Sequence, residues 1–165
     1  MTVTDVHKDP EALTMAITAE FDAAAERVWQ LWSDPRQLER WWGPPTYPAT
    51  VVDHDLVPGG RVSYFMTSPE GEKYHGWWRV IAVEAPRALE LEDGFADDAG
   101  QPNPDMPTTI TRVTFDDRAG GGTTMTILTQ FPSLEAMEQM AEMGMEEGMR
   151  SAMGQMDDIL AAAQQ

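Results

Sequence analysis

The sequence predicts an α+β fold in which a curved antiparallel sheet of six or seven strands wraps around one long C-terminal helix, with two short helices after the first strand. Three observations favour this fold. Short segments of strand-like sequence, separated by turn residues, fill the middle of the chain, and a single long amphipathic segment follows them. No strand alternates regularly with a helix, as a parallel sheet would require.

Length and composition indicate one domain, residues 11–165, after a polar lead-in at residues 1–10. The chain has no cysteine, 11 basic residues and 28 acidic residues, which give a net charge of −17. Such a charge repels phosphate backbones and anionic lipids, so we expect no nucleic-acid or membrane partner. No apolar run reaches the roughly 18 residues of a membrane span, and the N-terminus lacks a secretory pattern. We therefore expect a cytoplasmic protein.

The first elements follow the lead-in. Apolar residues on alternate positions predict a strand with one buried face: Leu13, Met15, Ile17 and Phe21. Asp22 is placed to cap a helix over residues 23–33, whose apolar side carries two tryptophans. A second short helix begins at Asp34-Pro35 and ends near Trp42, where Gly and Pro residues stop it.

The middle of the chain reads as six further strands. They are expected at residues 49–57, 61–66, 73–84, 88–93, 108–117 and 122–131, with Gly- or Pro-containing turns at 58–60, 69–71, 85–87 and 120–122. Residues 94–107 are rich in Gly, Pro and Asp, which predicts a long loop that could cover a cavity. This spacing favours an antiparallel sheet.

The last helix is expected to run from the N-cap Ser133 to about Ala162, roughly 45 Å. It carries seven of the twelve methionines. Most of its apolar residues share one side, which predicts that the helix lies across the sheet: Leu134, Met137, Ala141, Met145, Gly148, Met149, Ala152, Met156, Ile159 and Leu160.

Glycine, glutamate and methionine residues of the same helix indicate irregular geometry and solvent exposure near its start. Gly144 and Gly148 are costly inside a helix unless something approaches closely there or the helix bends. Glu138 and Glu142 lie in or beside the apolar side, which indicates a wet end. Met140 and Met143 fall outside it and suggest a cavity rim or a dimer contact, so a homodimer is a candidate assembly.

Methionine and tryptophan side chains indicate a cavity between sheet and helix, because both adapt to apolar and aromatic ligands. In each adjacent tryptophan pair the two side chains diverge, so one of Trp77 and Trp78 faces inward; strand parity groups Trp78 with Tyr74, Gly76 and Val80 and leaves open which face is concave. Ordinary core packing is the alternative interpretation. The candidate ligand-binding residues are Trp41, Trp42, Tyr64, Met66, Trp78, Met145 and Met149.

Evidence for catalysis is weaker. The sequence has no compact metal-ligand set and no nucleotide-binding or nucleophile motif, so we expect no metal and no cofactor. Four side chains could act as acid, base or oxyanion donor if the fold brings them into the cavity: His54, His75, Arg61 and Tyr64.

The segment FDAAAERVWQLWSDPRQLERWWGPP, residues 21–45, resembles the start of the START-like helix-grip (SRPBCC) superfamily. More narrowly, it resembles the branch named after the C-terminal domain of the ATPase activator of the ninety-kilodalton heat-shock chaperone. The Pro58-Gly59-Gly60 turn, Gly76, Pro86 and the final helix extend the resemblance. That helix has methionines where the family often has a tryptophan and two leucines.

The resemblance implies the helix-grip fold and a cavity used for several purposes. Three functions follow, in order of preference. The first is binding of a small hydrophobic or aromatic molecule, such as a lipid, polyketide or flavonoid. The second is a cyclase, dehydratase or hydrolase activity on a polyketide-like substrate in the same cavity. The third is a co-chaperone-like module that binds a protein partner such as a chaperone.

Overall fold

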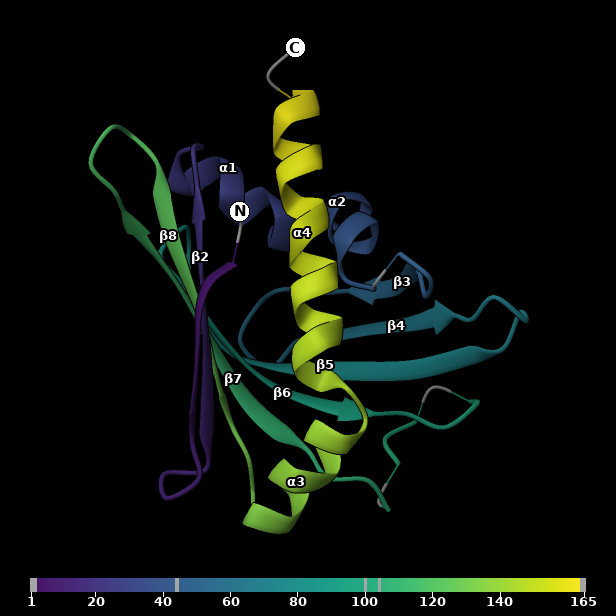
Figure 1. The fold of residues 1–165 in the computed structure, drawn as a ribbon. Coiled ribbons are helices and arrows are strands. Elements are labelled where there is room, and N and C mark those ends of the chain that lie inside the picture. Colours follow the sequence, from purple (N-terminus) through teal and green to yellow (C-terminus); the bar gives the residue numbers. More distant parts are fainter. Residues whose placement is uncertain (1–2, 44, 100, 104, 164–165) are drawn as a thin grey trace.

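The computed structural model of the chain describes residues 3–163 except 44, 100 and 104, and it does not describe the side chains of residues 145 and 161–163. It contains an open antiparallel sheet of eight strands that curves around a long helix near the C-terminus (Figure 1). The predicted α+β helix-grip architecture is thus confirmed, with one or two strands more than expected.

The strands are β1 (Val3–Asp9), β2 (Thr14–Phe21), β3 (Ala49–His54), β4 (Arg61–Thr67), β5 (Lys73–Glu84), β6 (Ala88–Phe95), β7 (Thr109–Asp117) and β8 (Thr123–Gln130). Their order across the sheet is β1-β2-β8-β7-β6-β5-β4-β3. Every neighbouring pair is antiparallel, and β2 joins β8, from opposite ends of the chain, with Thr14 opposite Gln130. The sheet therefore has β1 and β3 as its edges.

The strand that the sequence did not reveal is β1, which occupies the expected lead-in. It pairs with β2 along the edge of the sheet. Only Val3 is buried and Val6 is partly buried, so the apolar alternation that reveals a strand is too weak here. Another boundary also differs from expectation, because β6 continues through Gly94 and Phe95 into the expected loop.

The short helices are α1 (Ala25–Ser33) and α2 (Pro35–Trp41). Asp34 caps α2 as expected, since its carboxylate accepts a hydrogen bond from the backbone N–H of Arg36 at 3.0 Å. Asp22 does not cap α1; Ala24 stands at that position without a side-chain cap.

The final helix is interrupted, which corrects the expectation of one continuous helix. It consists of α3 (Leu134–Glu142) and α4 (Met145–Ala163). The break falls at Gly144, whose φ of 82° lies in the left-handed region that glycine adopts at little cost. Of the two explanations for the helix glycines, the bend thus applies at Gly144. The break lets α4 cross the sheet while α3 turns away at its lower end (Figure 1).

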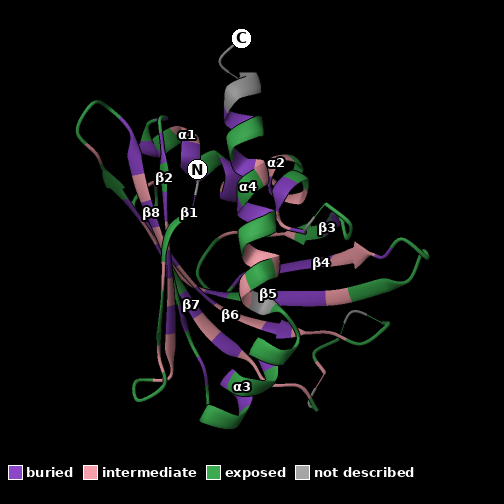
Figure 2. Ribbon diagram, in the orientation of Figure 1, coloured by how far each residue is buried: buried purple, intermediate pink, exposed green. Residues whose placement is uncertain are grey.

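The core lies between the inner face of the sheet and helices α1, α2 and α4, where the buried segments face one another (Figure 2). Trp32, Trp41 and Trp78 are fully buried there. The side chain of Gln155 on α4 donates hydrogen bonds to the carbonyls of Trp41 and Gly43, at 3.3 and 2.7 Å. These bonds fix α4 against the end of α2 and so define the space left below it.

Candidate ligand-binding pocket

A hollow of about 280 Å³ opens between the inner face of β4–β7 and the helices α3 and α4. Most of its wall is apolar, and the methionines come from both the sheet and the helices. We call it the Trp42 pocket; it is lined by Trp42, Tyr64, Met66, Asp93, Gly94, Phe95, Thr109, Met140, Met143, Gly148 and Met149. Its size suits one small molecule of a few rings.

The aromatic side of the pocket is built in two layers. Trp42 lines the pocket, and its ring lies 4.9 Å from that of Trp78 and 5.4 Å from that of Trp41, both edge to face. Trp41 and Trp78 are fully buried behind it and do not line the pocket. The indole N–H of Trp41 donates to the carbonyl of Leu31 at 2.8 Å. Trp41 and Trp78, which were expected to contact the ligand, therefore pack behind Trp42 and hold it in place.

Tyr64 reaches the pocket because Gly76 leaves room for it. The two residues are opposite each other on β4 and β5. A Cβ atom on Gly76 would come within 2.4 Å of the Tyr64 hydroxyl, so any larger residue would displace the ring. In its place over Gly76, the Tyr64 hydroxyl donates a long hydrogen bond of 3.4 Å to Asp93.

Asp93 is the principal polar group of the pocket. It lies on β6, next to Trp78 of β5 and Thr109 of β7. Burial raises the pKa of its carboxyl group to about 7, although the Tyr64 hydroxyl and the Gly94 backbone N–H favour the charged form. The side chain is half-buried because the pocket itself is hollow, and its exposed part lines the pocket. Among the described residues, no basic side chain lines this pocket.

Tyr64 responds to the same surroundings. Burial, and then the nearby Asp93 carboxylate, raise the pKa of the Tyr64 hydroxyl well above its usual value. The indole N–H groups of Trp42 and Trp78 act in the opposite direction, yet neither reaches hydrogen-bonding geometry. Tyr64 therefore remains a neutral donor, and Asp93 can be either an acid or a base near neutral pH.

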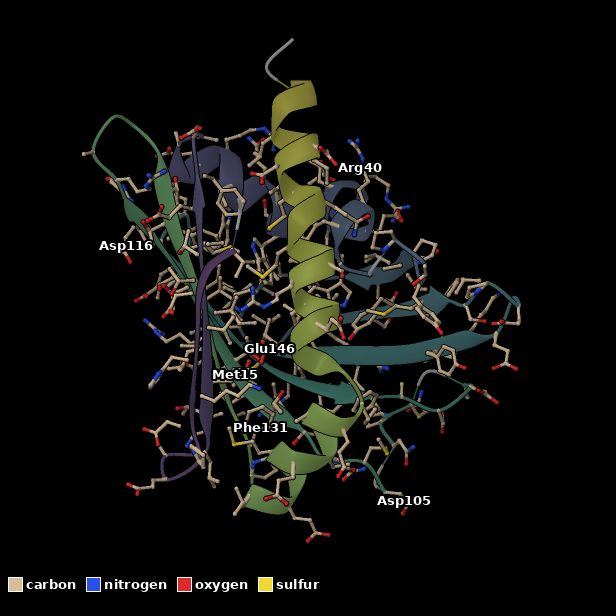
Figure 3. All side chains as sticks on the ribbon, in the orientation of Figure 1. Met15, Arg40, Asp105, Asp116, Phe131 and Glu146 are labelled. Atoms are coloured by element: carbon tan, nitrogen blue, oxygen red, sulfur yellow. The ribbon has the colours of Figure 1, made fainter. Side chains whose placement is uncertain are left out.

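Two further hollows lie near the Trp42 pocket, and one of them is continuous with it. A space of about 30 Å³, enough for about one water molecule, continues inward and shares Trp42, Asp93 and Met149 with it. Beyond Met15 lies a wider hollow of about 560 Å³, beside the first turn of α4. Figure 3 shows Met15, Phe131 and Glu146 around it. It is crossed by the Lys8–Glu146 ion pair of 2.6 Å and is more polar, so the Trp42 pocket is the better ligand site.

The structure separates the remaining catalytic candidates from this pocket. The His54 ring contacts the carbonyl of Trp32 at 3.0 Å, and among the described residues it is not part of the lining of the Trp42 pocket or of the two hollows near it. Arg61 and His75 instead line a hollow on the outer face of β3–β5. Of the four candidates, only Tyr64 lines the Trp42 pocket, so the structure does not bring His54, His75 and Arg61 into the cavity between sheet and helix.

Four of the seven expected ligand-binding residues lie together in the pocket wall: Trp42, Tyr64, Met66 and Met149. The fifth expected residue, Met145, has a side chain that the structure does not describe. Met140 and Met143, expected at a rim or dimer contact, also line the pocket, with Met143 exposed at its edge. Glu138 and Glu142 are exposed on α3, as a wet end requires.

Asp93 was not among the predicted site residues, although the sequence contains a signal that it faces the interior. Leu89, Leu91 and Asp93 fall on alternate positions of one strand, and the first two are fully buried. A carboxylate that continues a buried alternation points to the interior. Phe95, two positions further on, continues the same face into the pocket.

Within the described part of the chain, no group of three or more His, Asp and Glu side chains is arranged to hold a metal ion. None of the described helices is long and apolar enough to span a lipid bilayer.

Comparisons with known proteins agree with this architecture. The model of the family described as "Activator of Hsp90 ATPase homolog 1-like protein" matches residues 22–161. The crystal structure of protein Ms6760 from Mycobacterium smegmatis is similar, with 52% identity, a TM-score of 0.89 and 96% of each chain covered. An NMR structure from Arthrobacter aurescens has 52% identity and a TM-score of 0.93 over 98% of this chain and 93% of that one.

A more distant NMR structure, from Staphylococcus epidermidis, has 26% identity and a TM-score of 0.84, with 97% of this chain and 95% of that chain covered. No curated protein matches the chain.

Proposed function

The chain belongs to the activator of Hsp90 ATPase homolog 1-like family, and from this premise we propose that it binds a small apolar or aromatic molecule in the Trp42 pocket. One observation carries this function: methionine and aromatic side chains from the sheet, α3 and α4 surround a hollow of about 280 Å³ that contains one polar pair, Asp93 and Tyr64. An apolar wall with few polar groups is typical of small-molecule sites.

The wall is adaptable as well as apolar. Met66 comes from β4, Met140 and Met143 from α3 and its end, and Met149 from α4. Unbranched thioether side chains change rotamer easily, so the pocket can fit rings of different shape. The aromatic layer behind Trp42 is rigid by contrast, since Trp41 and Trp78 each contact Trp42 edge to face and Trp32 packs edge to face on Trp41.

A ligand panel tests this function. Flavonoid-like, polyketide-like and fatty-acid ligands are titrated while the melting temperature and tryptophan fluorescence are recorded, since a ligand against Trp42 changes its emission. The Met66→Trp variant fills the pocket and should abolish binding. Val52→Trp adds the same indole at an exposed position of β3 and should leave it intact. Absence of any response across the panel would contradict the function, as would equal binding by the two variants.

A second function, cyclase, dehydratase or hydrolase activity on a polyketide-like substrate, is favoured by the Asp93–Tyr64 pair. A carboxyl group with a pKa of about 7 exists in both forms near neutral pH, so the Asp93 carboxylate can take the proton from the carbon between the ketone and the β-hydroxyl group and then pass it to the hydroxyl, which leaves as water as the C–C double bond forms. The neutral Tyr64 hydroxyl can donate to an oxygen of the same molecule.

This activity is tested with a linear β-hydroxyketone probe, whose dehydration to an enone is followed by mass spectrometry. The Asp93→Asn variant should bind the probe and fail to convert it. Equal conversion by the variant and the parent protein would exclude Asp93 as the base.

A further inference from the structure

We propose that the ligand of the Trp42 pocket is a hydrophobic amine, whose ammonium group pairs with Asp93 while its apolar part lies among the methionines. This inference rests on the proposed function and names the chemical class of its ligand. It starts from the position of a single carboxylate in an apolar wall.

Asp93 has hydrogen-bond partners but no counter-ion among the described residues. Its partners are the Tyr64 hydroxyl and the backbone N–H of Gly94, both neutral. None of the ion pairs in the described part of the chain involves Asp93, although several other acidic side chains of the sheet pair with arginines, as Glu92 does with Arg79 on the outer face. A carboxylate that is partly removed from water and has no cation beside it is costly, so a bound cation would stabilise it.

The walls around Asp93 suit an organic cation better than a metal ion. Trp42, Tyr64 and Phe95 line the same hollow, and aromatic rings attract ammonium groups through their faces. The thioethers of Met140 and Met149 supply soft apolar contacts for the carbon skeleton. A small inorganic cation would lose its hydration shell here without gaining enough oxygen ligands.

Charge excludes the opposite class of ligand. No basic side chain among the described residues lines the pocket, and the chain carries a net charge of −17. A fatty acid or another carboxylate would therefore lie beside Asp93 in a mainly apolar pocket without a compensating cation. An amine would instead be attracted from a distance by the acidic surface.

If the ligand is an amine, its affinity for the pocket should depend on pH. Among the described residues, Tyr64 on β4 is the other titratable side chain that lines the pocket; β7, α3 and α4 contribute Thr109, methionines and Gly148. Amine affinity should therefore rise as Asp93 ionises, between about pH 6 and about pH 8, while the affinity of a neutral ligand of the same shape stays constant.

The experiment compares three probes with one carbon skeleton: naphthylethylamine, naphthylethanol and naphthylacetic acid. Affinities are measured by calorimetry at physiological salt, which screens the general surface charge. We expect the amine to bind about tenfold more tightly than the alcohol, and the acid to bind most weakly. In Asp93→Asn the preference for the amine should disappear, while Asp105→Asn, which removes an exposed loop carboxylate that does not line the pocket, should retain it.

The results distinguish a failure of the amine inference from a failure of ligand binding in the pocket. If the alcohol binds as tightly as the amine, or if Asp93→Asn keeps the preference, the amine inference is overturned and ligand binding in the pocket stands. If none of the three probes binds, both are contradicted. Circular dichroism of each variant verifies that the fold is intact.

Discussion

Replacing Asp93 with asparagine removes a charge from the pocket while retaining the size of the side chain and an oxygen that accepts from Tyr64. The carboxyl pKa is about 7 in the folded protein, against an ordinary value of 3.8 for an aspartate that is free in water, as in the unfolded chain. Since the folded pKa is the higher one, the stability contributed by this group is fully present below about pH 4 and is lost as the pH rises through about 7. The charged form is the one that folding disfavours.

The magnitude follows from the difference of about three pKa units, which corresponds to about 4 kcal/mol once both states are fully ionised. Part of this penalty is already present at about pH 5, where the unfolded carboxyl is ionised, and water in the pocket reduces the remainder. We therefore expect Asp93→Asn to stabilise the protein by about 1 to 3 kcal/mol more at about pH 8 than at about pH 5.

Urea unfolding at the two pH values measures this difference directly. In thermal unfolding it corresponds to an additional rise in Tm of roughly 3 to 8 °C for a chain of this length. Asp105→Asn, at an exposed loop position, controls for the removal of one negative charge from an acidic protein. An Asp93→Asn gain that is equal at both pH values, or that matches the Asp105→Asn gain, would refute the reasoning that Asp93 is desolvated in the folded state.

Two further pairs of substitutions test other parts of the structure by urea unfolding. Gly144→Ala should destabilise the protein by about 1 kcal/mol, because alanine adopts a φ of 82° only with strain. Gly154→Ala should stabilise the protein by a similar amount, because Gly154 lies inside α4 and a Cβ atom there would meet open space. A stabilising Gly144→Ala would contradict the break between α3 and α4. Thr123→Val should cost about 1 to 3 kcal/mol, because the fully buried Thr123 hydroxyl donates to the carbonyl of Ala23 at 2.6 Å. Thr124→Val, on the opposite face of β8, should change stability by less than about 0.5 kcal/mol, and equal losses would show that the bond is unimportant.

The sequence predicted the architecture well because periodicity and turn residues are local signals. The alternation over residues 13–21 and the Pro58-Gly59-Gly60 turn indicate their elements without knowledge of any partner. The edge strand β1 lacked such a signal, because a strand that buries little needs few apolar residues. Gly144 indicated an irregularity in the last helix. Whether a helix bends at a glycine or accepts a close neighbour there depends on what packs against it, which the sequence does not show.

The site was harder to predict, because it depends on which faces meet. Trp42 and Trp41 are adjacent in sequence, and only the packing of α2 against α4 decides that Trp42 lines the hollow while Trp41 fills the core. His54 and His75 both lie on strands, but the register of β3 and β5 places neither at the pocket. Asp93 could have been recognised from strand parity alone, and its raised pKa required the depth of the pocket as well.

The pairing of β2 with β8 has a consequence for how the protein is made. β2 emerges from the ribosome before the strand beside it in the sheet, which belongs to residues 123–130, so everything from α1 to β7 must be synthesised before the two can meet. Until then β2 has only β1 as a neighbour, and its other edge is open to pairing with the wrong strand. Closing so long a stretch of chain is slow, on the order of milliseconds to seconds for sheet proteins. A nascent chain that stalls before β8 therefore exposes an unpaired edge, and its release should lead to aggregation or proteolysis rather than to a smaller folded protein.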